Sequence, residues 1–186
     1  MKNDFLLNGD DTMTRSINEI GISTLNALCL FIKYLPYGRN SNRLDLSLVW
    51  KERKGTCSSK HAFLKRVADL NNISVDLILG MYKMNYSNTP KIGDTLKTTN
   101  LKYIPEAHCY LKINNNRFDY TSSTSNFNRI KKDILLERQI LPEQVSEFKV
   151  HFHKIYLRDW IKKNNILYSF EDIWKLREQC IKKLSN

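Results

Sequence analysis

The sequence has few of the features that mark secreted, membrane-spanning or metal-stapled proteins. It holds only four cysteines, and no two have the spacing of a redox or zinc motif: Cys29, Cys57, Cys109 and Cys180. The first eleven residues contain only a short apolar stretch, which is no secretory signal. The longest apolar stretch, residues 25–35, is too short to span a bilayer. We therefore expect a cytoplasmic protein with reduced thiols and no membrane partner.

Acidic residues are outnumbered by basic ones. Thirty Lys and Arg residues against nineteen Asp and Glu residues give a formal net charge of +11. An excess of this size raises nucleic acid, acidic lipid and acidic substrates as partners. The basic residues are scattered, however, in pairs such as Lys131-Lys132 and Lys162-Lys163, and no aromatic-basic motif of the RNA-binding kind occurs. We interpret the charge as a solvated basic surface and do not expect nucleic acid as the partner.

No internal repeat, linker or low-complexity tract divides the 186 residues, and 41% of them are hydrophobic. This is enough apolar material to form one hydrophobic core without disulfide bonds or metal ions. We predict a single α+β domain over residues 1–186, in which helices are segregated from an antiparallel sheet.

Hydrophobic periodicity indicates where the elements lie. We expect helices at 16–34, 44–50 and 57–70, strands at 74–84, 107–113, 117–120 and 148–157, and two helices after the last strand. The final helix is expected to begin at Ser169, which forms a variant capping box with Asp172. His151 and His153 would share a face of the strand 148–157, but without further ligands we expect no metal site.

Cys57 stands at the start of the predicted helix 57–70, two residues after Gly55. The unpaired N–H groups of a first helical turn and the helix dipole favour negative charge, so they stabilise a thiolate there. The same N–H groups can hold the oxyanion of an acyl-transfer intermediate. Cys57 is therefore the candidate nucleophile, although a lone cysteine at such a position is more often a small buried hydrophobe.

A hairpin is predicted to place a histidine beside a carboxylate. His108 and Asp119 lie on either side of the asparagines 114–116. A two-residue turn at 114–115 makes them diagonal neighbours on one face, whereas a three-residue turn puts them on opposite faces. Asparagine tolerates positive φ, which favours the two-residue turn. Asp119 would then orient His108, and His108 would take the proton of Cys57.

Three blocks of the sequence carry a resemblance to a known family. They are Gly55-Thr56-Cys57-Ser58-Ser59-Lys60-His61-Ala62-Phe63-Leu64, Glu106-Ala107-His108-Cys109-Tyr110-Leu111 and Phe118-Asp119-Tyr120-Thr121. In their order and their strand-turn-strand setting they resemble the Cys, His and Asp blocks of the transglutaminase-like superfamily, over about residues 37–121. Cys109 departs from the pattern, because the family often has an aromatic residue there.

The resemblance implies a papain-like fold, in which a helix bearing the cysteine packs on an antiparallel sheet bearing the histidine and aspartate. Additional helices would flank this core at both ends, with residues 122–186 forming a C-terminal strand and helices. The resemblance also implies an acyl-enzyme mechanism, with Cys57, His108 and Asp119 as catalytic residues and either water or an amine as the acyl acceptor. We expect no cofactor.

Other residues near these blocks have two interpretations each. Substrate contacts and a second oxyanion donor are expected upstream of the cysteine, among Tyr37, Arg39, Asn40 and Trp50. Arg39 suits a substrate carboxylate or is an exposed turn arginine. His61, one helical turn after Cys57, is the alternative base, but no carboxylate lies near it in sequence, which favours a packed histidine. Cys109 alternates away from His108 and is expected in the core.

We therefore predict a thiol-dependent enzyme that acts on the amide or ester carbonyl of a peptide or small amide. A hydrolase, of the peptidase or amidase kind, is the first hypothesis, and an acyl transferase is its near variant. The alternative class is a catalytically idle basic module that binds nucleic acid or an acidic protein. Thiol reactivity separates these hypotheses, because an active site of this kind makes Cys57 react faster than the other three cysteines.

Overall fold

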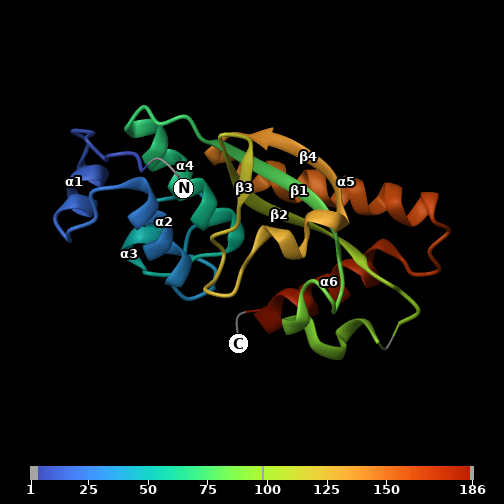
Figure 1. The fold of residues 1–186 in the computed structure, drawn as a ribbon. Helices are drawn as coiled ribbons and strands as arrows, with labels where there is room; N and C mark the ends of the chain where they lie inside the picture. Colours follow the sequence, from blue (N-terminus) through green and yellow to red (C-terminus); the bar gives the residue numbers. More distant parts are fainter. Residues whose placement is uncertain (1–3, 98, 185–186) are drawn as a thin grey trace.

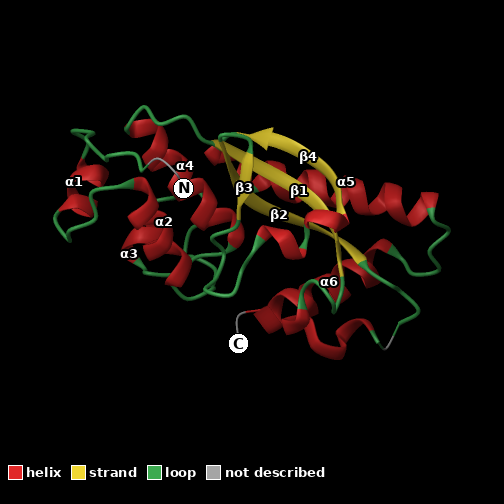
Figure 2. Ribbon diagram, in the orientation of Figure 1, coloured by secondary structure: helices red, strands yellow, loops and turns green. Residues whose placement is uncertain are grey.

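The computed structural model describes residues 4–97 and 99–184, and these form a mixed α+β fold around one four-stranded sheet (Figures 1 and 2). The strand order is β3-β2-β1-β4, and every neighbouring pair is antiparallel. The strands are β1 (Asp76–Met84), β2 (Ile104–Ile113), β3 (Asn116–Phe118) and β4 (Ile134–Ile140). Within the described ranges, no helix has the length and apolarity needed to cross a membrane.

Helices are segregated from the strands along the chain. In the described residues, four α-helices precede β1 and two follow β4: α1 (Thr12–Asn18), α2 (Leu25–Tyr34), α3 (Leu48–Lys51), α4 (Cys57–Leu70), α5 (Glu147–Lys163) and α6 (Phe170–Leu184). Short 3-10 segments lie in the connections between elements: η1 (Pro90–Leu96) between β1 and β2, η2 (Phe127–Arg129) and η3 (Lys131–Asp133) between β3 and β4, and η4 (Pro142–Val145) between β4 and α5. The first four helices gather at one end of the sheet, while α6 packs against η1 (Figure 1).

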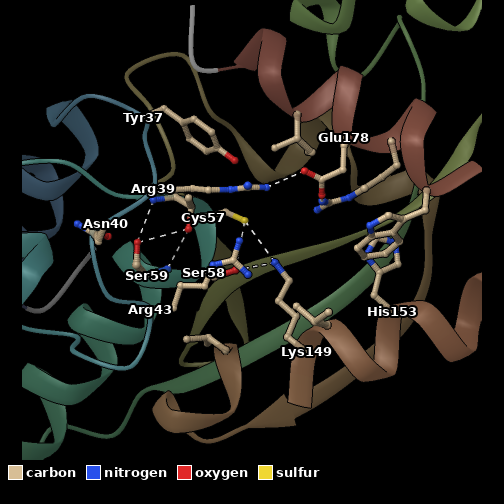
Figure 3. A pocket seen from close by; sticks show the side chains of 16 residues that line it. Tyr37, Arg39, Asn40, Arg43, Cys57, Ser58, Ser59, Lys149, His153 and Glu178 are labelled. Carbon is tan, nitrogen blue, oxygen red and sulfur yellow. Dashed lines mark hydrogen bonds and ion pairs between the residues drawn. The ribbon is translucent and has the colours of Figure 1, made fainter. Parts of the chain in front are cut away.

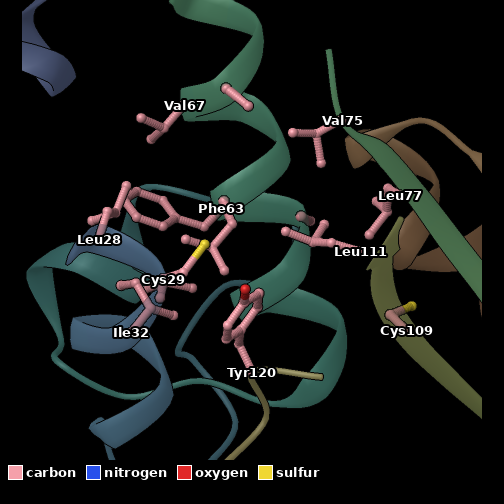
Figure 4. Close-up of a cluster of buried hydrophobic side chains, with 14 of the residues drawn as sticks. Leu28, Cys29, Ile32, Phe63, Val67, Val75, Leu77, Cys109, Leu111 and Tyr120 are labelled. Atoms are coloured by element: carbon pink, nitrogen blue, oxygen red, sulfur yellow. The ribbon is translucent and has the colours of Figure 1, made fainter. Parts of the chain in front are cut away.

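The two faces of the sheet bury different side chains, as the alternation of a strand requires. One face packs against α2 and α4 through a cluster that includes Leu77, Cys109 and Leu111 (Figure 4). The opposite face, which includes Ile78 and Tyr110, packs with α6, η1 and η2. Cys109 thus lies in the core on the side of α4, as its position next to His108 predicts.

The predicted helix 57–70 and the predicted two-residue turn are both confirmed. Helix α4 has these bounds. Asn114 and Asn115 adopt positive φ angles of 47° and 63°, and Ile113 pairs with Asn116 across the turn. The capping box of the last helix is confirmed too, because Ser169 N–H and Asp172 N–H each donate to the side chain of the other residue.

The predicted helix 16–34 is two helices. Gly21 adopts a φ of 81°, a left-handed conformation that ends the first segment. Thr24 then caps α2 by accepting a hydrogen bond from the N–H of Ala27. The short helix expected at 44–50 begins later, at Leu48, and leaves Leu44 70% exposed.

The predicted strand 148–157 is wrong, because this segment belongs to α5. The helix buries Lys149, His153, Leu157 and Trp160, which recur at spacings of four, four and three residues. This is helical periodicity. It is hidden in the sequence because two of the buried side chains are polar. Strand β4 was not predicted, since it is half exposed at the sheet edge and carries charged residues.

Candidate functional site

Helix α4 begins with a cysteine held at a well-capped terminus. The Thr56 side chain accepts from the N–H of Ser59 at 3.3 Å, and the Ser59 hydroxyl accepts from the N–H of Thr56 at 2.9 Å. Cys57 is the first helical residue and is 8% exposed. A Cβ on Gly55 would lie only 2.8 Å from Lys60 Cγ, so glycine allows the preceding loop to pass close to this turn. The thiol therefore sits where backbone N–H groups favour negative charge.

His108 and Asp119 meet as the two-residue turn requires. His108 Nε2 lies 3.0 Å from Asp119 Oδ2, and Asp119 Oδ1 accepts from the N–H of Thr121 at 3.0 Å. The ring is also close enough to Cys57 for its charge and its N–H to act on the thiol. Since Nε2 faces the carboxylate, Nδ1 is the nitrogen left for the sulfur. The structure thus brings all three predicted residues together.

The charges of these three groups support one another. Burial opposes ionisation of Cys57, but Lys149 and His108 outweigh it and lower the pKa of the thiol to about 6. Burial likewise disfavours the imidazolium, yet Asp119 and Cys57 hold the pKa of His108 well above its usual value. The pKa of Asp119 is lowered despite burial, chiefly by His108. A thiolate-imidazolium pair is therefore the favoured state near neutral pH.

Lys149 is the residue of this site that the sequence prediction missed. It comes from α5 and is 8% exposed. Its Nζ lies 3.8 Å from Cys57 Sγ and donates to the Ser58 hydroxyl at 2.6 Å. Burial would lower the pKa of this ammonium, but Cys57 is the foremost of the anionic groups that raise it. The signal that could have found it is the helical spacing of Lys149 with His153 and Leu157, which the strand interpretation discarded.

Replacing Lys149 with methionine should raise the pKa of Cys57 by about one pH unit, because the nearest fixed positive charge is lost while the volume is kept. The rate of alkylation by iodoacetamide, followed from pH 4 to pH 9, gives this midpoint. Lys162→Met, on the exposed end of the same helix, should leave it at about pH 6. An unchanged midpoint in Lys149→Met would mean that His108 alone stabilises the thiolate.

His61, the alternative base, is bonded to the backbone on both sides. Its Nε2 accepts from the N–H of Tyr120 at 2.8 Å, so Nδ1 carries the proton that is donated to the carbonyl of Cys57 at 2.7 Å. Burial lowers the pKa of His61 to about 4, which keeps the ring neutral. His61 therefore ties the start of α4 to the segment that follows Asp119.

Lys60 makes a second tie from the same helical turn. Its ammonium is fully buried and donates to the carbonyls of Leu35 at 2.5 Å and Thr121 at 2.8 Å. Burial lowers its pKa to about 8. Together with the His61 bonds, these contacts fix the position of the loop after Asp119 relative to the thiol.

The ring of His108 also rests on a packed tyrosine. The Tyr110 and His108 ring centroids are 6.1 Å apart, and the Tyr110 hydroxyl donates to Glu137 at 2.5 Å. Gly80 of β1 pairs with His108, and a Cβ there would lie 2.7 Å from the Tyr110 ring. Glycine at this position therefore leaves the space that Tyr110 fills.

Two cavities meet at Cys57. The larger, about 290 Å³, lies between the loop before α3, the start of α4, and helices α5 and α6 (Figure 3). The smaller, about 140 Å³, is lined by His108 and Asp119. Tyr37, Cys57 and Ile181 line both cavities. A molecule bound across the thiol can therefore place one part in each.

Three of the four residues expected to contact substrate lie at these cavities. Tyr37, Arg39 and Asn40 all line the larger one. Asn40 Nδ2 donates to Glu52 and to the carbonyl of Lys54, while its Oδ1 is buried without a partner among the described residues. Arg39 donates to Glu178 at 2.9 Å.

Trp50 lies elsewhere and is corrected to a core residue. Helix α3 turns its ring inward, where it stacks on Phe63 at a centroid distance of 6.3 Å and packs on Phe31 at 5.5 Å. The Arg53 guanidinium covers the ring at 4.0 Å. Trp50 lines neither of the two cavities at Cys57.

The two histidines of α5 do not share a face. His151 is exposed, whereas His153 is buried with Nε2 2.9 Å from the carbonyl of Pro105. Residues two apart point in different directions on a helix, which corrects the arrangement expected for a strand. Over residues 4–97 and 99–184, no group of three or more His, Cys, Asp or Glu side chains is placed to hold a metal ion.

The comparisons with known proteins leave the site to be interpreted from its own geometry. No protein-family model, curated protein or solved structure matches the chain.

Proposed function

We propose that this chain is a thiol-dependent enzyme that acts on an amide or ester carbonyl through an acyl-enzyme intermediate on Cys57. One observation carries the proposal: a buried thiol at a helix start interacts with a histidine whose other nitrogen is held 3.0 Å from a buried carboxylate. Nucleophile, base and orienting group are the parts that acyl transfer requires. The lowered pKa of Cys57, about 6, supplies the thiolate at neutral pH.

In the proposed reaction, Cys57 Sγ attacks the carbonyl carbon and a C–S bond forms. The resulting oxyanion is held by free N–H groups of the first turn of α4, with the Lys149 ammonium next to the sulfur. His108 then gives its proton to the leaving amine or alcohol as that bond breaks, which leaves a thioester. Water, or an amine, gives a proton to His108, attacks the thioester and releases Cys57.

The fold supports the proposal that residues 37–121 form a transglutaminase-like, papain-like core. Helix α4, which carries Cys57, packs on β2, which carries His108. Asp119 is the residue that directly follows β3. The two-residue turn between β2 and β3 sets the register that places Asp119 beside His108. The cysteine, histidine and aspartate also come in the order of the resembling family. We propose hydrolysis as the reaction, with a peptide or small amide as the substrate.

The proposed function predicts selective thiol chemistry. With iodoacetamide at pH 6, Cys57 should react at least about a hundredfold faster than the other cysteines, because half of it is thiolate there. Burial raises the pKa of Cys29 to about 12 and that of Cys180 to about 11, and it raises the pKa of Cys109. Mass spectrometry of peptides after timed labelling gives the four rates.

Burial alone can protect three cysteines, so acylation is tested directly. Incubation with a panel of thioesters and anilides should leave an acyl mass on Cys57 and release the leaving group with turnover. Cys57→Ala should abolish both, while Cys180→Ala, at a buried site on α6, should retain them. Slow labelling of Cys57 with no acyl adduct would contradict the proposal. Salt-dependent nucleic-acid binding in that case would favour the basic binding module.

A further inference from the structure

The two cavities beside Cys57 differ in the residues that line them. The position of His108 indicates which part of a substrate each cavity would bind. His108 lines the smaller cavity and does not line the larger one. In the proposed reaction His108 must protonate the leaving group, so the leaving group lies on the side of the smaller cavity. The acyl group, on the other side of the carbonyl carbon, then extends into the larger cavity.

The larger cavity is lined by an excess of positive charge. In the described part of the chain, the lining holds four cationic side chains and one carboxylate, that of Glu178; the cations are Arg39, Arg43, Lys149 and Arg177. Arg39 and Arg177 are both paired with that carboxylate. Among the described residues, neither Arg43 nor Lys149 lies within ion-pair distance of any carboxylate. Both side chains extend into the cavity toward Cys57 (Figure 3).

Acylation removes the foremost negative charge acting on Lys149 among the described residues, while the carboxylate of Glu106 acts on this ammonium from beyond ion-pair distance. Before the reaction, the Cys57 thiolate lies 3.8 Å from Lys149 Nζ. A thioester is neutral, so the buried ammonium, 8% exposed, loses its nearest counter-charge when the intermediate forms. An unpaired buried charge is unfavourable. An anionic group on the acyl chain, placed between Lys149 and Arg43, restores the pairing at that step.

The rest of the lining suits a short apolar chain. Val145, Val150, Trp174 and Ile181 form walls of the cavity. Its volume of about 290 Å³ is at the lower end of small-molecule pockets, which suits a small acyl group. We propose that the larger cavity binds a small acyl group bearing a carboxylate, so that the substrate is an amide or ester of a dicarboxylic or acidic amino-acid type. This inference rests on the proposed function.

A pair of alkylating reagents of nearly equal size tests the charge. Iodoacetate and iodoacetamide both form a C–S bond with Cys57 and release iodide, but only iodoacetate is anionic. The iodoacetate-to-iodoacetamide rate ratio should be higher for Cys57 than for free cysteine in the same buffer. Arg43→Gln should lower the iodoacetate rate about fivefold, as expected for one charge pair with an exposed arginine, and change the iodoacetamide rate less than twofold.

Arg129→Gln is the matched control, because Arg129 lines the smaller cavity. It should leave the ratio unchanged. A ratio that falls in Arg129→Gln and not in Arg43→Gln would overturn the assignment of the acyl group to the larger cavity. A wild-type ratio equal to that of free cysteine would overturn the preference for anions, even when Cys57 remains the fastest of the four thiols.

A ladder of substrates tests the same point by turnover. Mono-anilides of dicarboxylic acids of increasing length are compared with their methyl esters, which lack the charge. One length should have a kcat/KM at least about fivefold above that of its ester, and Arg43→Gln should remove this difference. Equal turnover of acids and esters would contradict the inferred preference for a carboxylate, but it would not contradict the proposed enzyme activity. If no anilide or ester acylates Cys57, the proposed function itself fails.

Discussion

Replacing His108 with alanine is expected to lower turnover by about a thousandfold, because both the general base and the general acid are lost. The pKa of Cys57 should rise from about 6 by about two pH units, since the imidazolium no longer stabilises the thiolate. The sign follows from the charge: a lost cation favours the neutral thiol, so alkylation begins at higher pH. At pH 6 the alkylation rate should fall only about tenfold, because the more basic thiolate is the better nucleophile.

The measurements are turnover of a cleaved anilide and the pH profile of iodoacetamide alkylation. His151→Ala is the control, because this histidine is exposed on α5 and should change neither. Asp119→Asn should resemble His108→Ala in turnover with a smaller shift of the thiol midpoint, since the ring remains but loses its partner at 3.0 Å. A His108→Ala protein with the wild-type midpoint and turnover would remove the histidine from the mechanism.

The parts of the site that the sequence predicts are those fixed by local rules. The start of α4 follows from a break at Gly55 and a cap at Thr56. The pairing of His108 with Asp119 follows from the turn, because one residue more or less would flip the facing of every side chain on one strand. Both are decided by a few neighbouring residues, so a pattern in the sequence is sufficient to find them.

Local rules cannot identify Lys149 as a residue of the site, because its contact with Cys57 joins residues 92 positions apart. Its burial is offset by groups that it meets only in the folded chain, foremost the Cys57 thiolate and the Ser58 hydroxyl. In sequence it is one of many lysines, and it breaks the apolar pattern that would have indicated the helix. Polar side chains with a partner across the fold are thus where hydrophobic periodicity fails.

Trp50 shows the opposite failure. Its place just before Cys57 in sequence predicted a substrate contact, but Trp50 belongs to the four-residue helix α3, which directs the ring toward α2 and α4. The larger cavity is instead closed by α5 and α6, which come from the C-terminal part of the chain. Closeness to Cys57 in sequence therefore identified the wall formed by the loop before α3, and not the wall formed by α5 and α6.

Helix α6 is held to the sheet by a buried ion pair, and breaking it should have the largest effect on stability. Arg177 donates to both oxygens of Glu106 on β2, at 2.8 and 2.6 Å, with the side chains only 12% and 6% exposed. Arg177→Met should lower the free energy of unfolding by about 3–5 kcal/mol at pH 7, because it leaves a buried carboxylate without its main partner. Urea denaturation gives this value.

Two control variants distinguish the effect of breaking the buried ion pair from the effect of removing an arginine side chain. Arg66→Met breaks an ion pair with Glu143 whose side chains are 46% and 58% exposed, and it should cost at most about 1 kcal/mol. Glu106→Gln combined with Arg177→Met should be more stable than Arg177→Met alone, because the second change removes the unpaired charge. A double variant no more stable than the single one would place the loss in packing.

The pH dependence of this loss has a definite sign. Burial alone would raise the pKa of Glu106, but Arg177 outweighs it and lowers the pKa from 4.5 to about 2. The stabilisation by the pair is therefore present above pH 4.5 and is lost as the pH falls toward 2.

In Arg177→Met the buried carboxyl of Glu106 has a raised pKa and takes up a proton, which relieves the unpaired charge. The difference in stability between wild type and variant should thus shrink from pH 7 to pH 4. An equal difference at both values would mean that Arg177 holds α6 by the packing of its side chain and not by its charge.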